Sequence, residues 1–541
     1  MTSNNIEFIY QNKIFKIKNP DPNETLLNYV RTKLKKTGTK EGCAEGGCGA
    51  CTIVLGELKK NQINYKAINS CISFLPTLQG KQLILVEDLI SKEGLLHPVQ
   101  QAMVDYHGSQ CGFCTPGFIM SLFSMFKKSS KFRDEEIKDS IAGNLCRCTG
   151  YKPIMKAAKS LKKKNKIDHF SKNKKDTINL LEKINNKSIA IYNKGKKYFA
   201  PRYVQELKKI LKKNIDVDFL SGGTDLSLRV TKERKDFSSI IYMNSINDLN
   251  YIKNNNKYIE IGASTPLIEL EYYIKKYYPD FTKILKRYGS PQIRNVATVA
   301  GNIATASPIG DCLPLLLSLN AKVVLQDFKK TKIFLLDNFF ISYRKTKLKK
   351  GQFIHSIRIP LYKGNTFKAY KVSKRFDDDI SSVCAAFNLE IVKNKIQSIR
   401  IAYGGMAAIP KRAIYCEKIL SNSIVTDEIV SKAKKALEKD FKPISDMRAS
   451  GLYRMEVAKN LLEKLYFEIK QKKMVKYDTV QNKIQGLYQD IFGFMGWEVL
   501  PPFVAHGVQQ KTDNERSLLL KSYKEHLVKN VVAGSLVSSN A

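Results

Sequence analysis

Apolar and polar residues alternate along the first part of the chain, which predicts a small β-rich domain over residues 1–82. The alternation on either side of Gln11-Asn12 has the two-residue period of a β-hairpin. The expected elements are strands at 6–10 and 13–17, a helix within 25–36, and further strands at 52–55 and 83–86. Residues 40–51 are instead rich in glycine and cysteine and predict a loop.

The spacing of apolar residues changes to that of helices over residues 83–163. Four apolar stripes recur every three or four residues and predict four short helices. The stripes are Val99, Met103 and Tyr106; Phe118, Leu122 and Met125; Ile137, Ile141 and Leu145; and Ile154, Ala157 and Leu161. Gly108 is expected to end the first helix, and Thr115-Pro116 to begin the second. This pattern predicts a helical bundle with cysteines at helix ends.

The remaining two thirds of the chain predict larger α+β domains. Residues 164–179 are basic and polar and predict a linker. An α/β domain is expected at 180–362 and a second domain at 366–470. The tail, 471–541, matches no known pattern; Leu520, Tyr523, Leu527 and Val531 predict one amphipathic helix in it.

The charge of the chain is strongly positive, with a formal net charge of +41. The lysines are scattered, and no basic patch interleaved with aromatic residues stands out, so we expect no nucleic-acid partner. No apolar stretch is long enough to span a membrane and no leader precedes the first strand, which predicts a cytoplasmic protein without membrane contact. In that reducing compartment, closely spaced cysteines are more often metal ligands than disulfides.

Eight of the eleven cysteines form two quartets. The first is Cys43, Cys48, Cys51 and Cys71, and its C-x4-C-x2-C spacing with one remote cysteine is typical of a plant-type [2Fe–2S] site. Structural zinc is the alternative, but zinc sites more often show paired short knuckles. Glycines between the cysteines would let backbone N–H groups approach the cluster sulfurs.

The second quartet is Cys111, Cys114, Cys146 and Cys148, with C-x2-C followed by C-x-C. Zinc fits this spacing better than it fits the first, so a zinc-binding scaffold without catalytic activity stays open at this point. The other three cysteines, Cys312, Cys384 and Cys416, are isolated and are expected to be ordinary thiols.

Two glycine-rich loops follow in the α/β domain, at 219–226 and 299–308. Neither has the G-x-G-x-x-G pattern of a Rossmann dinucleotide site. Consecutive small residues expose backbone N–H groups that can hold a pyrophosphate. Two tight turns without a ligand explain either loop equally well when it is taken alone.

Three motifs in one order, CAEGGCGAC, SQCGFCTPGF and GNLCRCTGY, closely resemble the iron–sulfur region of the molybdenum hydroxylases, above all the xanthine dehydrogenases. The resemblance implies a multidomain α+β protein. Its domains would be a ferredoxin-like β-grasp [2Fe–2S] domain, a helical-bundle [2Fe–2S] domain, a two-lobed FAD domain of the vanillyl-alcohol-oxidase type and an α+β C-terminal flavoprotein domain. It also implies that Gln110 contacts the molybdenum cofactor of a partner at a subunit interface.

The segments SPIGD, FFISYRKT and AYKVSKRFDDDIS extend the resemblance to the flavin region. The residues that it places around FAD are Leu220, Ser221, Gly222, Gly223, Thr224, Asp225, Leu226, Tyr288, Ala300, Gly301, Asn302, Ser307, Asp311, Tyr343, Ile354 and Lys371. It implies that the backbone of 220–226 and 300–302 binds the FAD phosphates and that Asp311 holds the ribityl or ribose part. Tyr288, Ile354 and Lys371 would lie near the flavin ring, and Tyr343 near the nicotinamide.

The resemblance also implies a function. The chain is too short to include the molybdenum domain of the complete enzyme, so it resembles the iron–sulfur/FAD subunit of a xanthine dehydrogenase. A large partner subunit would carry molybdopterin and oxidise a purine, so no catalytic residue is expected on this chain. The two subunits would assemble as a dimer of heterodimers. Electrons would pass through two [2Fe–2S] clusters to FAD and on to NAD+. The alternative is a molybdenum hydroxylase that oxidises an aldehyde or an N-heterocycle.

Overall fold

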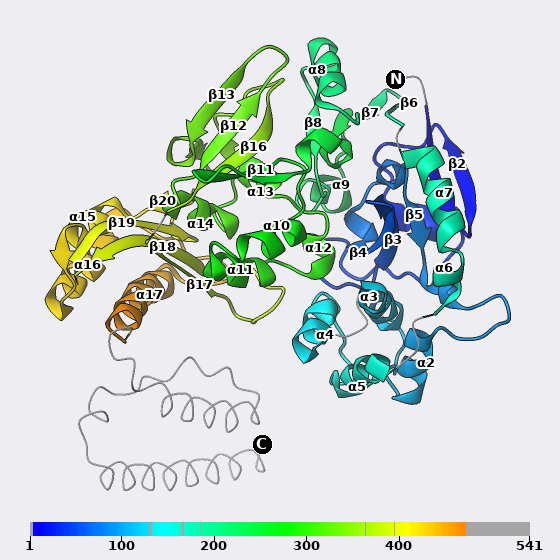
Figure 1. Cartoon of the computed structure of the whole chain (residues 1–541), viewed down its shortest axis with the longest axis horizontal. Helices are drawn as coiled ribbons and strands as arrows, with labels where there is room; N and C mark the ends of the chain where they lie inside the picture. Colours follow the sequence, from blue (N-terminus) through cyan, green and yellow to red (C-terminus); the bar gives the residue numbers. More distant parts are fainter. Residues whose placement is uncertain are drawn as a thin grey trace, which may run out of the picture. The chain divides into compact units, whose positions relative to one another are not determined.

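The computed structural model describes residues 4–128, 133–163, 167–185, 187–362, 364–393 and 395–471 (Figure 1). Contacts divide the chain into two units, 1–466 and 467–541. The amphipathic helix predicted in the tail lies outside the described residues, as does the whole tail except Gln471. No helix within the described ranges has the length and hydropathy needed to cross a membrane.

The N-terminal domain is a mixed five-stranded sheet in the order β2-β1-β5-β3-β4. Its elements are β1 (Asn5–Tyr10), β2 (Lys13–Lys18), α1 (Leu26–Thr32), β3 (Thr52–Lys59), β4 (Gln62–Asn69) and β5 (Gln82–Ile84). The predicted hairpin is confirmed, since β1 and β2 are antiparallel and the two turn residues, Gln11 and Asn12, both have positive φ. Leu26 and Val30 of α1 share one core with Ile6 and Phe8 of β1. This arrangement confirms the β-grasp domain.

The second domain is the predicted helical bundle (Figure 1). Its helices are α2 (Pro98–Asp105), α3 (Thr115–Lys128), α4 (Asp134–Ile141) and α5 (Lys152–Ser160). Helix α3 begins at the predicted Thr115 and is buried from Gly117 to Phe126. One prediction was wrong: Leu145 lies beyond α4 and is 42% exposed. Its N–H leaves the helical pattern because it donates to the carbonyl oxygen of Cys48 in the first domain.

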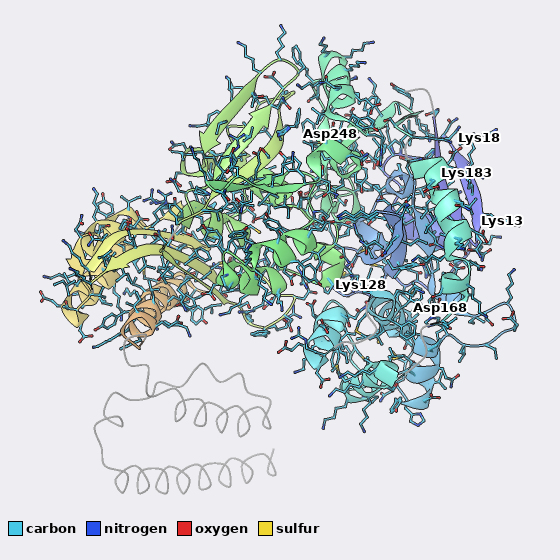
Figure 2. All side chains as sticks on the ribbon, in the orientation of Figure 1. Lys13, Lys18, Lys128, Asp168, Lys183 and Asp248 are labelled. Carbon is cyan, nitrogen blue, oxygen red and sulfur yellow. The ribbon has the colours of Figure 1, made fainter. Side chains whose placement is uncertain are left out.

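The segment predicted as a linker, 164–179, is helical over most of its described residues. It contains α6 (His169–Lys172) and the start of α7 (Lys174–Asn185). Asp168, labelled in Figure 2, is buried and binds two residues of the bundle, with Oδ2 3.0 Å from His97 Nε2 and Oδ1 2.9 Å from Lys127 Nζ. Helix α7 packs on the first domain through Leu181 and Ile184. Charge composition did not reveal this role because the anchoring residues are few among many lysines.

The third domain has two lobes, each built on a sheet. The first lobe contains β6 (Ile189–Asn193), β7 (Lys196–Ala200), α8 (Val204–Lys213), β8 (Asp218–Leu220), α9 (Leu228–Thr231) and β9 (Ser239–Tyr242). Its strand order is β6-β7-β9-β8, with β8 and β7 both parallel to β9. The glycine-rich loop 220–226 therefore leaves the sheet at the carboxyl end of β8.

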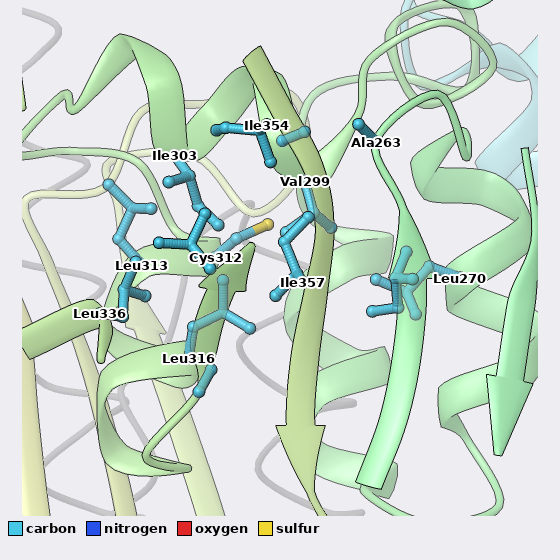
Figure 3. Close-up of a cluster of buried hydrophobic side chains, with 14 of the residues drawn as sticks. Ala263, Leu270, Val299, Ile303, Cys312, Leu313, Leu316, Leu336, Ile354 and Ile357 are labelled. Atoms are coloured by element: carbon cyan, nitrogen blue, oxygen red, sulfur yellow. The ribbon is translucent and has the colours of Figure 1, made fainter. Parts of the chain in front are cut away.

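The second lobe is an antiparallel sheet in the order β10-β11-β16-β12-β13. Its strands are β10 (Ile252–Asn254), β11 (Tyr258–Gly262), β12 (Lys322–Gln326), β13 (Thr331–Leu335) and β16 (Phe353–Pro360), and a hairpin is formed by β14 (Phe340–Ser342) and β15 (Lys345–Thr346). Its helices are α10 (Leu267–Ile274), α11 (Pro279–Lys286), α12 (Pro291–Arg294), α13 (Val299–Thr305) and α14 (Cys312–Ser318). Figure 3 shows the core of this lobe, in which Ile354 of β16 lies beside Val299 and Ile303 of α13.

The last described domain is a sheet of antiparallel strands with helices. Its elements are β17 (Thr366–Val372), β18 (Val383–Val392), β19 (Lys395–Gly404), β20 (Lys411–Arg412), α15 (Ile414–Leu420), β21 (Ser423–Ile424), α16 (Asp427–Asp440) and α17 (Gly451–Gln471). Cys384 and Ala386 of β18 share the core of α13 and α14. The α+β C-terminal domain thus continues the hydrophobic core of the preceding lobe.

Candidate functional site

The four cysteines of the first quartet converge in the β-grasp domain. Cys51 and Cys71 are buried, and their Sγ atoms are 3.2 Å apart. Cys43 is hydrogen-bonded to Cys48 and Cys71, which lowers the pKa of Cys43. The backbone N–H of Glu45 also donates to Cys43 Sγ, at 3.4 Å. Residues from one loop and from the segment before Phe74 thus turn four sulfur atoms toward one another.

Glycines let the loop of this quartet pass close to the sulfurs. A Cβ atom on Gly42 would lie 2.7 Å from Cys48 Sγ, and one on Gly46, where φ is +84°, would lie 2.7 Å from Ile72 Cδ1. Among the described residues, no three His, Cys, Asp or Glu side chains surround a point as one metal ion requires. The four converging thiols fit a [2Fe–2S] cluster, which takes two cysteine ligands on each iron.

The cysteines of the second quartet also meet in pairs. Cys114 is hydrogen-bonded to Cys146, and Cys111 to Cys148. Burial and the bond to Cys146 raise the pKa of Cys114 to about 12. Cys146 is buried, whereas Cys111 and Cys148 are exposed. This quartet therefore lies at the surface of the described chain, and its four thiols also fit a two-iron cluster.

The two quartets are directly connected through the backbone. The N–H of Leu145, the residue before Cys146, donates to the carbonyl oxygen of Cys48 at 3.0 Å. The N–H of Cys146 donates to the Tyr151 hydroxyl at 2.9 Å. This bond fixes the backbone of the second quartet at Cys146. One hydrogen bond thus joins a cysteine of the first quartet to the neighbour of a cysteine of the second.

The two glycine-rich loops of the third domain face each other. A Cβ atom on Gly301 would lie 3.9 Å from the Cβ of Ser221. Gly222 passes so close to Val296 that a Cβ atom would lie 2.4 Å from its carbonyl carbon. Gly223 has a φ of +72°, and its Cβ atom would lie 2.6 Å from the carbonyl oxygen of Ile72. Loop 220–226 therefore touches the residue that follows Cys71.

Tyr288 and the 300–302 segment meet at Asn302. Asn302 Nδ2 donates to the Tyr288 hydroxyl at 3.0 Å, while the buried Asn302 Oδ1 has no hydrogen-bond partner. Burial raises the pKa of Tyr288 above its usual range. Gly310, in the loop from Ser307 to Asp311, packs on the same side chain, since its Cβ atom would lie 2.9 Å from Asn302 Nδ2. An unpaired acceptor beside two glycine loops fits a polar ligand such as FAD.

Asp311 and Lys371 form a buried ion pair. Lys371 Nζ lies 2.7 Å from Asp311 Oδ2 and donates to the carbonyl oxygen of Arg287 at 2.8 Å. Asp311 Oδ1 accepts from the Ser381 hydroxyl at 2.5 Å. Both carboxylate oxygens are therefore engaged, and the pair ties α14 to β17. Contacts of Asp311 with ribose and of Lys371 with the flavin ring stay predictions.

Two further predicted FAD residues differ in exposure. Ile354 is 5% exposed and belongs to the hydrophobic core (Figure 3). Tyr343 is 59% exposed between β14 and β15. The hairpin still reaches the first glycine-rich loop, because Arg344 forms an ion pair with Asp225. Of the remaining loop residues, Leu220 is buried, whereas Thr224 and Leu226 are half-buried.

Two contacts at this site were not predicted. Lys232, after α9, donates to the carbonyl oxygen of Cys43 at 2.5 Å and lies 3.4 Å from Glu45 Oε2. Gln292 of α12 binds Asn144, next to the second quartet. Neither lysine nor glutamine stands in a recognisable motif, and their partners are distant in sequence. Asn144, however, is part of GNLCRC, so its place beside Cys146 was a signal in the sequence.

Four family models match the chain in succession. Residues 9–75 match a 2Fe-2S iron-sulfur cluster binding domain, and residues 85–159 match a [2Fe-2S] binding domain. Residues 192–362 match the FAD binding domain in molybdopterin dehydrogenase. Residues 368–469 match the CO dehydrogenase flavoprotein C-terminal domain. The predicted fold class is thereby confirmed.

Curated relatives have the same name in several organisms. Xanthine dehydrogenase of Emericella nidulans is 33% identical over 482 residues, which cover 78% of this chain and 35% of that protein. Xanthine dehydrogenase 1 of Arabidopsis thaliana is 30% identical, with 77% of this chain and 36% of that protein covered. The chain thus spans about a third of the length of these relatives.

Solved structures resemble part of the chain. A Cu,Mo-CO dehydrogenase chain has a TM-score of 0.47 and 24% identity, covering 49% of this chain and 94% of its own. Quinoline 2-oxidoreductase from Pseudomonas putida 86 has a TM-score of 0.48 and 21% identity, covering 51% and 97%. The four consecutive domain matches, together with the curated relatives, lead to one conclusion. This chain carries the iron–sulfur and flavin domains of the molybdenum hydroxylase family of oxidoreductases.

Proposed function

We propose that this chain is the iron–sulfur/FAD electron-transfer part of a xanthine dehydrogenase that passes electrons from a molybdenum subunit to NAD+. The proposal rests on the domain matches and on relatives named xanthine dehydrogenase. The molybdopterin would be bound by the partner subunit, in a dimer of heterodimers. Purine as the substrate, NAD+ as the acceptor and a cytoplasmic location belong to this proposal.

Eight cysteines would hold the two clusters. The inner cluster would be bound by Cys43, Cys48, Cys51 and Cys71, and the outer cluster by Cys111, Cys114, Cys146 and Cys148. FAD would lie along the loops at 220–226 and 300–302, with Tyr288 and Asn302 beside them. When bound, iron–sulfur clusters transfer single electrons, whereas a flavin can exchange pairs with a nicotinamide.

One observation carries the proposal: the three sites follow one another through direct contacts. The outer quartet is exposed, and Leu145 beside it donates to Cys48 of the inner quartet. Behind the inner quartet, Gly223 of the flavin loop packs on the carbonyl oxygen of Ile72. These contacts follow the order outer quartet, inner quartet and flavin loop, which suits electrons that arrive from a partner at the outer quartet.

The surface around the outer quartet suits a protein partner. Phe113 beside Cys114 is 47% exposed and Leu145 beside Cys146 is 42% exposed. Gln110, next to Cys111, is also exposed. Exposed apolar side chains around a redox site are typical of a docking surface. We place the molybdenum subunit here.

The test is purification of this chain under anaerobic conditions together with the products of its neighbouring genes. We expect a brown protein that contains iron and flavin, shows two reduced cluster signals by electron paramagnetic resonance, and reduces NAD+ with hypoxanthine. If the purified complex oxidises only an aldehyde or an N-heterocycle, the proposal of a xanthine dehydrogenase is wrong and the chain serves another molybdenum hydroxylase. Carefully handled protein that contains zinc and no iron would contradict the electron-transfer proposal itself.

A further inference from the structure

A buried polar cluster lies where three domains meet beside the two quartets. It consists of Thr52 of the β-grasp domain, Ser121 and Asn144 of the helical bundle, and Gln292 of the FAD-binding domain. Each of these four side chains is at most 2% exposed. We call them the junction cluster. Hydrogen bonds within the cluster pair its hydroxyl groups and both amide nitrogens, whereas Gln292 Oε1 is buried without a partner. Such a buried network favours one geometry.

Asn144 and Gln292 make most of the hydrogen bonds in the junction cluster. Asn144 Nδ2 donates to the carbonyl oxygen of Gly49, between Cys48 and Cys51, at 3.1 Å. Asn144 Oδ1 accepts from Ser121 at 2.6 Å and from Gln292 Nε2 at 3.1 Å. Gln292 Nε2 also lies 3.0 Å from Ser121 Oγ. The Asn144 amide thus contacts the loop of the inner quartet, and the Gln292 amide, from another domain, holds the Asn144 side chain in place.

Glycines bring the backbones of the three domains together around these amides. A Cβ atom on Gly49 would lie 2.1 Å from the carbonyl oxygen of Gly143. A Cβ atom on Gly117, three residues after Cys114, would lie 2.3 Å from the carbonyl oxygen of Gly49. A Cβ atom on Gly143 would lie 2.3 Å from Ser290 Cβ. The first two contacts are with backbone atoms, which cannot move aside as a flexible side chain can, so they leave little freedom to the two cysteine loops.

The segment that carries Gln292 also carries the flavin-site residues. Tyr288 precedes α12, and the 300–302 loop follows it by a few residues. Asn295, after α12, donates to the carbonyl oxygen of Ala67 at 2.8 Å, and the buried Arg294 pairs with Asp139 of the bundle at 2.6 Å. The segment is therefore bound to both cluster domains. Gln292 reaches Asn144, the side chain that hydrogen-bonds to a cysteine loop. Ile293 packs on Cys51 and Cys71.

We propose that Asn144 and Gln292 are positioning residues, which set the distance and orientation between the two iron–sulfur clusters. This inference rests on the proposed function, because it requires a cluster at each quartet. Asn144 connects the two quartets, since its side chain binds Gly49 and the N–H of the next residue, Leu145, binds Cys48. Electron tunnelling and magnetic coupling both fall steeply with distance, so a small displacement at Asn144 would weaken both.

The experiment compares three variants of nearly unchanged side-chain volume in the full chain. Asn144→Leu and Gln292→Met remove the hydrogen bonds of the junction cluster. Asn295→Leu is the matched control, because it removes one buried bond between domains that does not involve a cysteine loop. Each variant loses a buried hydrogen bond, so we expect the Tm of each to fall by about 2–4 °C or more.

The decisive readout is the magnetic interaction between the two reduced clusters, measured by electron paramagnetic resonance at low temperature. We expect Asn144→Leu and Gln292→Met to retain the iron of the wild type and to lose or narrow the interaction splitting. Asn295→Leu should keep the wild-type splitting despite its lower Tm. Should Asn144→Leu fail to fold, Ser121→Ala removes one bond to Asn144 Oδ1 and should narrow the splitting less.

Two results would overturn the inference. Wild-type splitting in folded, iron-loaded Asn144→Leu, Gln292→Met and Ser121→Ala would show that the junction cluster does not position the clusters. Loss of the splitting in Asn295→Leu as well would show a general loosening between domains. Failure of the proposed function looks different, because the wild-type protein would then contain no iron and give no cluster signal.

Discussion

The two cysteine quartets have similar chemistry but opposite surroundings. In the inner quartet Cys51 and Cys71 are buried, and Gly49 beside them contacts the backbone of the helical bundle. In the outer quartet Cys111 and Cys148 are exposed, and Gly112 between Cys111 and Cys114 has open space around it. The inner loop is therefore determined by contacts between domains, whereas the outer loop is free to meet another molecule.

This difference matches two different requirements of redox sites that pass electrons in series. A site that passes electrons between domains needs fixed neighbours, and its loop can vary little. A site that accepts electrons from a partner must keep its sulfurs near the surface. Substitutions of the same type at the two quartets should therefore have unequal effects.

Gly49→Ala and Gly112→Ala should give the largest contrast. Both glycines have positive φ, +70° and +82°, so alanine is strained at either position. At Gly112 we expect a cost of about 1–2 kcal/mol, since the new methyl group meets no atom within 4 Å. At Gly49 the methyl group would lie 2.1 Å from the carbonyl oxygen of Gly143, and we expect more than about 4 kcal/mol. Denaturant unfolding checks this; equal losses would contradict it.

Asp168→Asn should loosen the domain of the outer quartet. Burial by itself would raise the pKa of Asp168, but the hydrogen bond with His97 and the charge of Lys127 outweigh it and hold this pKa well below its usual range. Removing the carboxylate leaves Lys127 without its buried partner charge, and we expect a loss of about 3–5 kcal/mol at neutral pH.

The loss in Asp168→Asn should depend on pH. A carboxyl group with a lowered pKa stabilises the fold above its unfolded pKa of about 4, and this stabilisation is lost as the pH falls toward the folded value. The Tm difference between wild type and Asp168→Asn should therefore shrink below about pH 4. Asp134→Asn in the same bundle is the control, since Asp134 forms only exposed pairs and should leave the Tm unchanged. A difference that grows in acid would refute the assignment.

Cys51→Ser and Cys148→Ser should each remove a different cluster signal. Cys51 is 1% exposed, so serine there buries a hydroxyl and should cost about 1–3 kcal/mol in addition to the inner signal. Cys148 is exposed, and serine there should remove the outer signal with little change in Tm. Iron analysis and electron paramagnetic resonance measure both effects. Loss of both signals or of neither in one variant would argue against two separate sites.

Phe113→Ser and Leu145→Ser should have the smallest effect on the isolated chain. Both side chains are substantially exposed, so we expect stability to change by less than about 0.5 kcal/mol. Their loss should weaken binding of the molybdenum subunit about tenfold, equivalent to ~1.4 kcal/mol. Ile424→Ser, 63% exposed in the C-terminal domain, is the control and should leave binding unchanged. If the affinity for the molybdenum subunit is unchanged in both variants, the docking surface does not include Phe113 and Leu145.

Local patterns predicted much of the fold. The hairpin at Gln11-Asn12 and the helix start at Thr115 were both visible from a few neighbouring residues. Leu145 was misplaced because a periodic stripe does not show that a backbone N–H will bond to another domain. The supposed linker was missed for the same kind of reason, since Asp168 is anchored by residues far from it in sequence.

By itself the sequence determined which residues could ligate iron and which loops could approach a phosphate, because ligand spacing and glycine content are local properties. Only the tertiary structure decided which quartet is buried and which is exposed. It also decided that Asp311 pairs with Lys371, 60 residues away, and that Gln292 binds Asn144 across 148 residues. Such pairings depend on how separate domains pack, and no short stretch of sequence contains both partners.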